Sequence, residues 1–318
     1  MNLGNGGNIK IFSGNAHVEL AKSIASLLNV ELGKSEVGRF SDGEISLKIN
    51  ESVRNADVYI IQPISMPVNE NLMELLIMID AMKRASAGTI AAVIPYYGYA
   101  RQDRKSRARD PISAKLVANL ITSAGCDRVI TMDLHCAQIQ GFFDIPLDHL
   151  VGMPKFRKYY MDKFKDMSDV VVVSPDLGSV ARARSLADKL NVPIAIIDKR
   201  RAKPNESEVM NIIGDVSGRK VLLLDDMIDT AGSITNAAVA LKNKGATEIF
   251  ACCTHGVLSG PALERLEKSP ISELVMLDTI AESCHGSIDK IKYLTVADVF
   301  AEAICRIHDG KAVSVMFD

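Results

Sequence analysis

Short apolar runs alternate with helix-like stretches along most of this chain, and that alternation limits its fold more than any other feature. The runs are residues 10–13, 57–62, 89–94, 128–132, 169–173, 193–197, 221–224, 248–251 and 273–276. Their short length and their Val and Ile content indicate buried strands, whereas residues 69–87 and 111–124 indicate helices. Such alternation predicts an α/β protein whose parallel sheets are covered on both faces and bind ligands at the carboxyl ends of their strands.

The length of the chain, 318 residues, predicts two domains. Residues 113–125 and 233–245 are helix-like stretches that end in glycine, and each is followed by a strand-like run at the same offset of 120 positions. A duplicated unit and a chance match between ordinary strand–helix units explain this echo equally well. We expect one domain over residues 1–150 and another over 151–300, with the segment near 300–318 completing the first.

Composition argues against several other classes of protein. The net charge of -2 argues against binding nucleic acid through overall charge. The six cysteines include no Cys-x-x-Cys pair, which favours reduced thiols over a disulfide framework or a zinc site. No apolar run approaches the ~18 residues of a membrane span, and the first residues lack the basic and apolar regions of a signal peptide. We therefore expect a cytoplasmic protein with no membrane and no nucleic-acid partner.

Residues 221–233 are the most informative segment for function. The strand-like run is followed by Asp225 and Asp226, whose carboxylates can accept hydrogen bonds from the hydroxyls of a sugar diol. Residues 229–233 are a turn of small and hydroxyl residues before a helix, which can hold a phosphate with backbone N–H groups. The segment therefore predicts a site for a sugar phosphate. The alternative is a plain strand–turn–helix junction with Ser233 as the helix N-cap.

A basic segment follows another predicted strand. Residues 101–109 contain five Arg or Lys side chains, and such a cluster on a loop can neutralise a polyphosphate. A solvated basic loop or a nucleic-acid patch would have the same composition, although the near-neutral net charge favours polyphosphate binding.

Three other strand ends carry weaker signals. Residues 174–180 place Asp176 before a glycine and a helix, so that the backbone could hold pyrophosphate and Asp176 could reach magnesium through water. Residues 198–201 contain cations that could stabilise a phosphoryl group in transfer, although a surface charge run is the commoner meaning. His135 ends a strand near Asp133 and is equally consistent with a structural role and with a nucleotide or magnesium role.

Residues 39–44 form a polar turn in which Phe40 could stack on a purine, while the carboxylates could accept from its amino group. Taken alone, this segment is an ordinary hairpin turn.

Together these segments resemble the ribose-phosphate pyrophosphokinase family, in its phosphate-activated class I. The most specific matches are residues 96–104 (Tyr-Tyr-Gly-Tyr-Ala-Arg-Gln-Asp-Arg), 138–146 and 225–232 (Asp-Asp-Met-Ile-Asp-Thr-Ala-Gly). The resemblance implies two type I phosphoribosyltransferase-like domains, each a mainly parallel sheet flanked by helices. It also implies transfer of the pyrophosphoryl group of Mg-ATP to the 1-hydroxyl of ribose 5-phosphate, giving 5-phosphoribosyl 1-pyrophosphate and AMP.

The resemblance further implies a role for particular residues. The catalytic residues are Lys199 and Arg201. ATP binds to Phe40, Asp42, Gly43, Glu44, Arg101, Gln102 and His135, with the Phe40 region supplied by a neighbouring subunit. Ribose 5-phosphate binds to Arg201, Asp225, Asp226, Asp229, Thr230, Ala231, Gly232 and Ser233. The Mg2+ positions are His135 and Asp176, and an allosteric site falls on Ser52, Arg54, Ser314 and Phe317.

Two positions depart from the family pattern. Ser233 stands where threonine is usual, and either hydroxyl can donate a hydrogen bond. Ala312 stands where many relatives have serine, which makes regulation by inorganic phosphate and ADP less secure than catalysis. The family also implies a homo-oligomer, a hexamer built from dimers. Two other functions stay open, a base phosphoribosyltransferase and a non-catalytic subunit associated with the synthetase.

Overall fold

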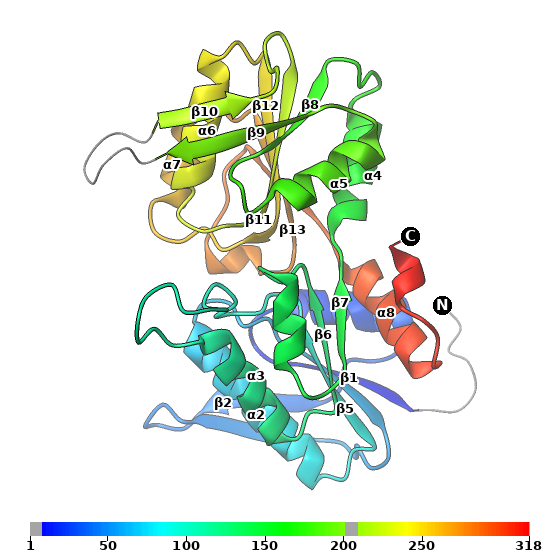
Figure 1. Ribbon diagram of the computed structural model, residues 1–318. Helices are drawn as coiled ribbons and strands as arrows, with labels where there is room; N and C mark the ends of the chain where they lie inside the picture. The colour runs from blue at the N-terminus through cyan, green and yellow to red at the C-terminus, as the bar shows by residue number, and fades with distance from the viewer. Residues whose placement is uncertain (1–7, 201–208, 318) are drawn as a thin grey trace. The chain divides into compact units, whose positions relative to one another are not determined.

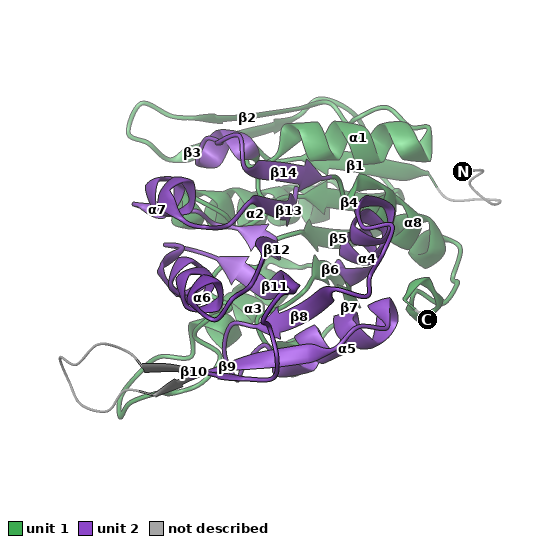
Figure 2. Cartoon of the chain, turned by 90° about the horizontal axis from the view of Figure 1, so that it is seen from above, with its two compact units in different colours: residues 1–151, 279–281, 295–318 green, residues 152–278, 282–294 purple. Residues whose placement is uncertain are grey.

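A computed structural model describes residues 8–200 and 209–317, shown as a ribbon in Figure 1. The chain divides into two compact units, one of residues 1–151, 279–281 and 295–318, and one of residues 152–278 and 282–294 (Figure 2). We call them unit 1 and unit 2 and describe each by itself. Whether each unit folds as an independent domain stays a prediction.

Unit 1 is built on a parallel sheet of five strands in the order β1-β4-β5-β6-β7. The strands are β1 (Ile9–Ser13), β4 (Asp57–Ile61), β5 (Thr89–Ile94), β6 (Arg128–Met132) and β7 (Leu147–Leu150). The helices are α1 (Val18–Leu28), α2 (Val68–Arg84), α3 (Ser113–Ala124) and α8 (Ala297–His308), with short 3-10 helices η1 (Ala137–Phe142) and η3 (Ser314–Met316). Helix α1 packs against α8, and α2 packs against α3.

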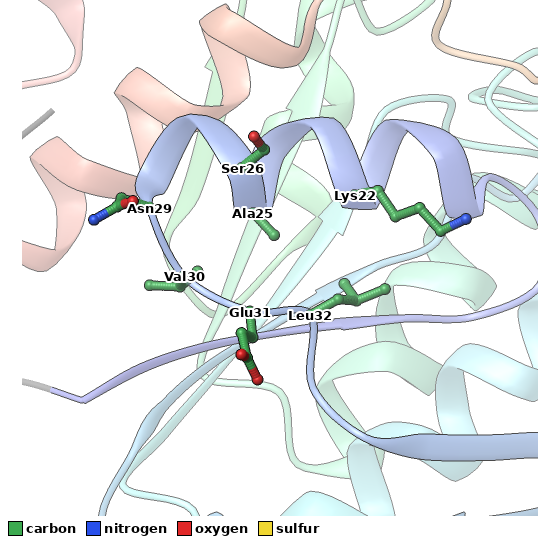
Figure 3. A pocket seen from close by; sticks show the side chains of 7 residues that line it. All are labelled: Lys22, Ala25, Ser26, Asn29, Val30, Glu31 and Leu32. Carbon is green, nitrogen blue, oxygen red and sulfur yellow. The ribbon is translucent and has the colours of Figure 1, made fainter.

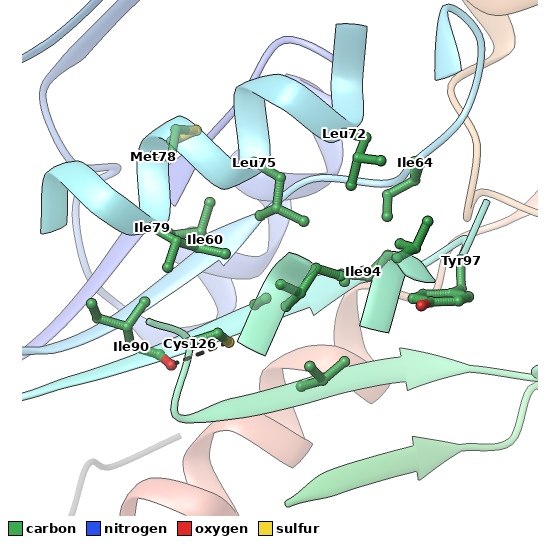
Figure 4. Packing of buried hydrophobic residues seen from close by; sticks show 14 of the residues in the cluster. Ile60, Ile64, Leu72, Leu75, Met78, Ile79, Ile90, Ile94, Tyr97 and Cys126 are labelled. Atoms are coloured by element: carbon green, nitrogen blue, oxygen red, sulfur yellow. Dashed lines mark hydrogen bonds between the residues drawn. The ribbon is translucent and has the colours of Figure 1, made fainter. Parts of the chain in front are cut away.

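One part of the core of unit 1 lies between the sheet and the α2–α3 pair. Helix α2 buries Leu75, Met78, Ile79 and Met82, whose spacing of three and four residues places them on one helix face. Figure 4 shows this face packed over the side chains of β4 and β5. Each buried aliphatic side chain of this size contributes roughly 1.5–3 kcal/mol to folding.

A hairpin precedes β4 in unit 1. Its strands, β2 (Ser35–Arg39) and β3 (Ile45–Ile49), pair antiparallel around residues 40–44. Arg39 forms an ion pair with Glu70 of α2 and lies 3.9 Å from Glu74, which ties the hairpin to that helix. The predicted turn is confirmed, whereas its two strands are absent from the sequence prediction.

Unit 2 is built on a sheet of seven strands in the order β10-β9-β8-β11-β12-β13-β14, in which only β10 runs antiparallel to its neighbour. Its strands are β8 (Val170–Ser174), β9 (Ile194–Arg200), β10 (Val209–Ile213), β11 (Lys220–Ile228), β12 (Glu248–Gly256), β13 (Glu273–Leu277) and β14 (Ile291–Leu294). Its helices are α4 (Met153–Lys163), α5 (Val180–Leu190), α6 (Gly232–Asn243) and α7 (Ala262–Lys268), with the 3-10 helix η2 (Glu282–Cys284).

The order of these strands locates a switch point in unit 2. The chain passes from β8 to β9 on one side and then to β11 on the other side of β8. In open parallel sheets of this kind, ligands bind outside the carboxyl ends of the two strands where the order reverses. Those ends are followed by residues 175–179 and 229–233.

The predicted α/β class, with mainly parallel sheets flanked by helices, is confirmed. Every predicted strand is present, but β11 continues to Ile228, so Asp225 and Asp226 lie inside the strand instead of after it. Helix α2 ends at Arg84 and α3 begins at Ser113, slightly inside the predicted bounds. All six cysteines are free, and the adjacent Cys252 and Cys253 are buried in β12. No helix in the described part of the chain is long and apolar enough to span a membrane.

Candidate functional site

The end of β11 presents an acidic pair beside the switch point. Strand β8 pairs with β11 from Lys220 to Leu223, whereas pairing with β12 continues as far as Ile228. Asp225 and Asp226 therefore lie beyond the β8 ladder but on a strand that β12 still holds in place. Asp226 is buried and Asp225 is half-buried.

The turn after β11, residues 229–233, leads into the N-terminus of α6, and we call it the anion cradle after its predicted role. Ala231 adopts a left-handed conformation with φ of 59° and is the N-cap of α6. The N–H groups of the first helical turn have no partner within their own helix, and the helix dipole favours negative charge there. Arg265 of α7 donates a hydrogen bond of 2.9 Å to the carbonyl oxygen of Thr230. A Cβ added to Gly232 would lie 3.2 Å from the same guanidinium, so the arginine packs closely on the turn.

The segment between β8 and α5 contacts both members of the acidic pair. Ser179 donates its backbone N–H to Asp176 Oδ1 at 3.0 Å and its hydroxyl to Asp225 Oδ1 at 2.8 Å. Arg182, in the first turn of α5, lies 3.4 Å from Asp226 Oδ1. The structure thus brings together two predicted ligand-binding segments, the one around Asp176 and the one that begins at Asp225.

Burial and neighbouring charge alter the acidity of the pair. Removal from water raises the pKa of Asp225 to about 7, and the nearby charge of Asp226 adds to the effect. The hydrogen bond from Ser179 acts in the opposite direction, because it favours the ionised carboxylate. Asp225 therefore changes charge near neutral pH.

The predicted catalytic cations lie on the strand beside β8. Lys199 is in β9, and its backbone pairs with Met210 of β10. Arg201 lies outside the described residues. The roles of both residues therefore stay predictions.

In unit 1 the predicted ATP segments follow neighbouring strands. Arg101 and Gln102 are exposed on the loop after β5, and His135 is exposed just after β6. The Cys136 thiol donates a hydrogen bond of 3.0 Å to Asp103 Oδ2, which joins the His135 segment to the basic loop. The structure thus brings these two predicted segments together.

The tip of the β2–β3 hairpin carries the remaining predicted ATP residues. Phe40 donates its N–H to the carbonyl oxygen of Glu44 at 2.8 Å, and Gly43 has a φ of 94°, which favours glycine. The Asp42 carboxylate accepts from the Glu44 N–H at 3.1 Å. Phe40 is 59% exposed, which leaves its ring accessible to a planar ligand.

The predicted allosteric residues lie at two places in unit 1. Arg54 donates its N–H to Ser52 Oγ at 3.4 Å in the segment before β4, and both residues are exposed. Ser314 begins η3, and its carbonyl oxygen accepts from the Phe317 N–H at 3.1 Å. Their regulatory role stays a prediction.

Two surface hollows of unit 1 contain none of the predicted site residues. One, of about 410 Å³, lies beside the end of α1 and is shown in Figure 3. The other, of about 290 Å³, lies at the opposite ends of β4 and β5 from the ATP segments and is lined in part by Asp57 and His308.

Sequence reasoning missed two residues that support the site. Arg265 reaches the cradle from α7, and His149 Nε2 accepts a hydrogen bond of 2.9 Å from the Leu134 N–H next to His135. Neither residue belongs to a motif, and only the folded chain brings them to these segments.

The mainly parallel sheet, the acidic pair at its switch point and the anion cradle define a type I phosphoribosyltransferase-like protein. The family model for the N-terminal domain of ribose phosphate pyrophosphokinase matches residues 9–125, and that for the phosphoribosyl synthetase-associated domain matches residues 200–318. The ribose-phosphate pyrophosphokinase of Clostridium perfringens is 66% identical over 311 residues, or 98% of each chain. That of Bacillus caldolyticus is 61% identical over 310 residues, again 98% of each chain.

A solved structure agrees with these relatives. The phosphoribosylpyrophosphate synthetase from Mycobacterium smegmatis is 42% identical and superposes with a TM-score of 0.91, covering 95% of this chain and 99% of that one. The chain belongs to the ribose-phosphate pyrophosphokinase family.

Proposed function

We propose that this chain is an ATP-dependent ribose-phosphate diphosphokinase, which transfers the pyrophosphoryl group of ATP to the 1-hydroxyl of ribose 5-phosphate. The observation that carries the proposal is the arrangement at the end of β11, where a pair of carboxylates precedes an anion cradle at the switch point. Asp225 and Asp226 accept hydrogen bonds from the ribose diol, and residues 229–233 hold the 5-phosphate.

The reaction needs two reactants in line and neutralisation of charge. The 1-hydroxyl loses its proton to solvent as its oxygen forms a bond to the β-phosphorus of ATP. The bond between that phosphorus and the oxygen bridging to the α-phosphate breaks, and its electron pair leaves with AMP. Few groups of the protein need to change covalently, so positioning and charge stabilisation supply most of the acceleration. We assign Lys199 and Arg201 to the charge on the transferred group, and Arg101, Gln102 and His135 to ATP.

The residues present are compatible with Mg2+ as the metal of the reaction. The described residues contain no cluster of three or more His, Cys, Asp or Glu side chains that could hold a metal. Mg2+ usually binds through one or two carboxylates, waters and the phosphates of a substrate, so Asp176 fits as the carboxylate. His135 is assigned to the metal on the family resemblance alone. When bound, Mg2+ neutralises phosphate charge.

The proposal also covers the oligomeric state of the enzyme and its regulation by small molecules. We expect a homo-oligomer, a hexamer, in which Phe40, Asp42, Gly43 and Glu44 of one subunit reach the adenine bound by another. We expect inorganic phosphate and ADP to act at Ser52, Arg54, Ser314 and Phe317, and we expect the enzyme in the cytoplasm.

A direct assay tests the proposal. Purified protein is given Mg-ATP and ribose 5-phosphate, with and without inorganic phosphate, and AMP and 5-phosphoribosyl 1-pyrophosphate are quantified. Equal amounts of both products support the proposal. Binding of ribose 5-phosphate without AMP production would favour the non-catalytic subunit, and consumption of 5-phosphoribosyl 1-pyrophosphate with a free base would favour the phosphoribosyltransferase.

A further inference from the structure

Arg182 is a positively charged side chain near the N-terminus of a helix, where positive charge is disfavoured. It lies in the first turn of α5, where the helix dipole favours negative rather than positive side chains. Its side chain is only 24% exposed, although arginine side chains in soluble proteins are mostly exposed. Arg184 on the same helix is exposed and provides a natural comparison.

The partner of Arg182 explains this placement. The Asp226 side chain is only 7% exposed, and Arg182 Nη1 lies 3.4 Å from its Oδ1. A buried carboxylate without a compensating charge is strongly disfavoured. Because β8 pairs with β11 only up to Leu223, the segment that follows β8 leaves the ladder and reaches the side chains of Asp225 and Asp226 at the end of β11.

We propose that Arg182 is a positioning residue that keeps the Asp226 carboxylate oriented as the acceptor for a ribose hydroxyl, and so makes the site select a sugar phosphate with an intact diol. The inference rests on the proposed function, because it takes the ligand to be ribose 5-phosphate. Ser179 orients Asp225 in the same way, because its hydroxyl donates a hydrogen bond to that carboxylate. One segment, residues 179–182, therefore orients both carboxylates. Arg182 acts through Asp226 and does not itself contact the sugar.

The experiment compares Arg182→Gln, Arg182→Lys and the control Arg184→Gln. Calorimetry measures the affinity of each protein for ribose 5-phosphate and for 2-deoxyribose 5-phosphate, and steady-state kinetics measures KM for ATP. We expect Arg182→Gln to weaken ribose 5-phosphate binding about ten- to hundredfold, the range for a lost hydrogen bond to a charged group. The preference over the deoxy sugar should fall with it, Arg182→Lys should recover part of both, and Arg184→Gln should match the wild type.

A double-mutant cycle with Asp226→Asn shows whether Arg182→Gln weakens binding through Asp226 or through an unrelated disturbance of the structure. If Arg182 acts through Asp226, the second substitution adds little to the first. Additive losses, an unchanged preference between the two sugars, or a rise in the KM for ATP alone would overturn the proposal, the last by placing Arg182 on the diphosphoryl group. Wild-type turnover is scored separately: if the wild type binds ribose 5-phosphate but forms no product, the proposed activity fails while the binding comparison still decides the role of Arg182.

Discussion

The charge of Asp225 should make the stability of the free protein depend on pH, and Asp225→Asn isolates that effect. Two hydrogen bonds to this side chain, from the Asp226 N–H at 2.9 Å and from the Ser179 hydroxyl at 2.8 Å, end on Oδ1. An asparagine keeps an acceptor at that position. The substitution therefore removes the charge and leaves these two hydrogen bonds in place.

The direction of the effect follows from the raised pKa. The pKa of Asp225 is about 7 in the folded protein, against an ordinary value of 3.8 for this side chain. The folded state therefore holds a proton that the unfolded state releases between these two pH values. The stabilisation from that proton is complete below the unfolded pKa and is lost as pH rises through the folded pKa. At 1.36 kcal/mol per pKa unit, about 2–3 kcal/mol should be lost between pH 5 and 8.

Chemical unfolding of the ligand-free, metal-free protein, followed by circular dichroism at several pH values, measures this loss. Asp225→Asn should gain stability relative to the wild type as pH rises from 5, and the gain should level off above pH 8. Asp289→Asn removes an exposed carboxylate of the same unit and should follow the wild type at every pH. A constant difference between Asp225→Asn and the wild type, or a gain that shrinks with rising pH, would refute the reasoning.

Three further substitutions test the cradle and the transfer step. Asp229→Ala should weaken ribose 5-phosphate binding about tenfold, and an unchanged affinity in calorimetry would show that the cradle is misassigned. Arg265→Gln should also raise the Kd for ribose 5-phosphate about tenfold because it releases the Thr230 carbonyl, with no change for exposed Lys268→Gln on the same helix. Lys199→Ala should lower kcat about 10²–10³-fold with little change in ribose 5-phosphate affinity, and equal losses in both would contradict a role in the transition state.

The strand, turn and helix of this segment could be predicted from the sequence because they are contiguous. A buried run and a small-residue turn between positions 221 and 233 specify a strand and the start of a helix, although the strand extends four residues further than the apolar run. The contacts from Ser179 and Arg265 could not be predicted in the same way. They join residues 46 and 35 positions apart, and they exist only because β8 and α7 lie beside β11 and its turn. Local patterns contain no information about strand order.

The failure to predict strands β2 and β3 from the sequence has a different physical cause. The residues of β2 are all half-buried or exposed, so the strand lacks the buried run or clean alternation that marks a strand in sequence. Hairpin strands of this kind are held by pairing and by contacts such as Arg39 with Glu70, which depend on the position of α2.

The two units share a reversal of strand order, although only one has the predicted sugar-phosphate site. In unit 1, Leu32 bridges to Ile11 on one edge of β1, and β4 pairs on the other edge. The chain therefore reverses direction between β1 and β4, as it does between β8 and β11 in unit 2. By the rule for open parallel sheets, the ends of β1 and β4 should also form a ligand site.

Side chains already fill that position in unit 1. Gln62, after β4, is fully buried, accepts from the Ala16 N–H at 3.1 Å and donates to Glu74 at 3.0 Å. Glu74 in turn accepts from the backbone N–H of Asn15 at 3.0 Å. The N–H groups that could hold an anion after β1 are thus bonded to internal oxygens, and a buried carboxylate already supplies negative charge there. Topology creates the opportunity for a site at both switch points, and the side chains at the strand ends decide which one can receive a sugar phosphate.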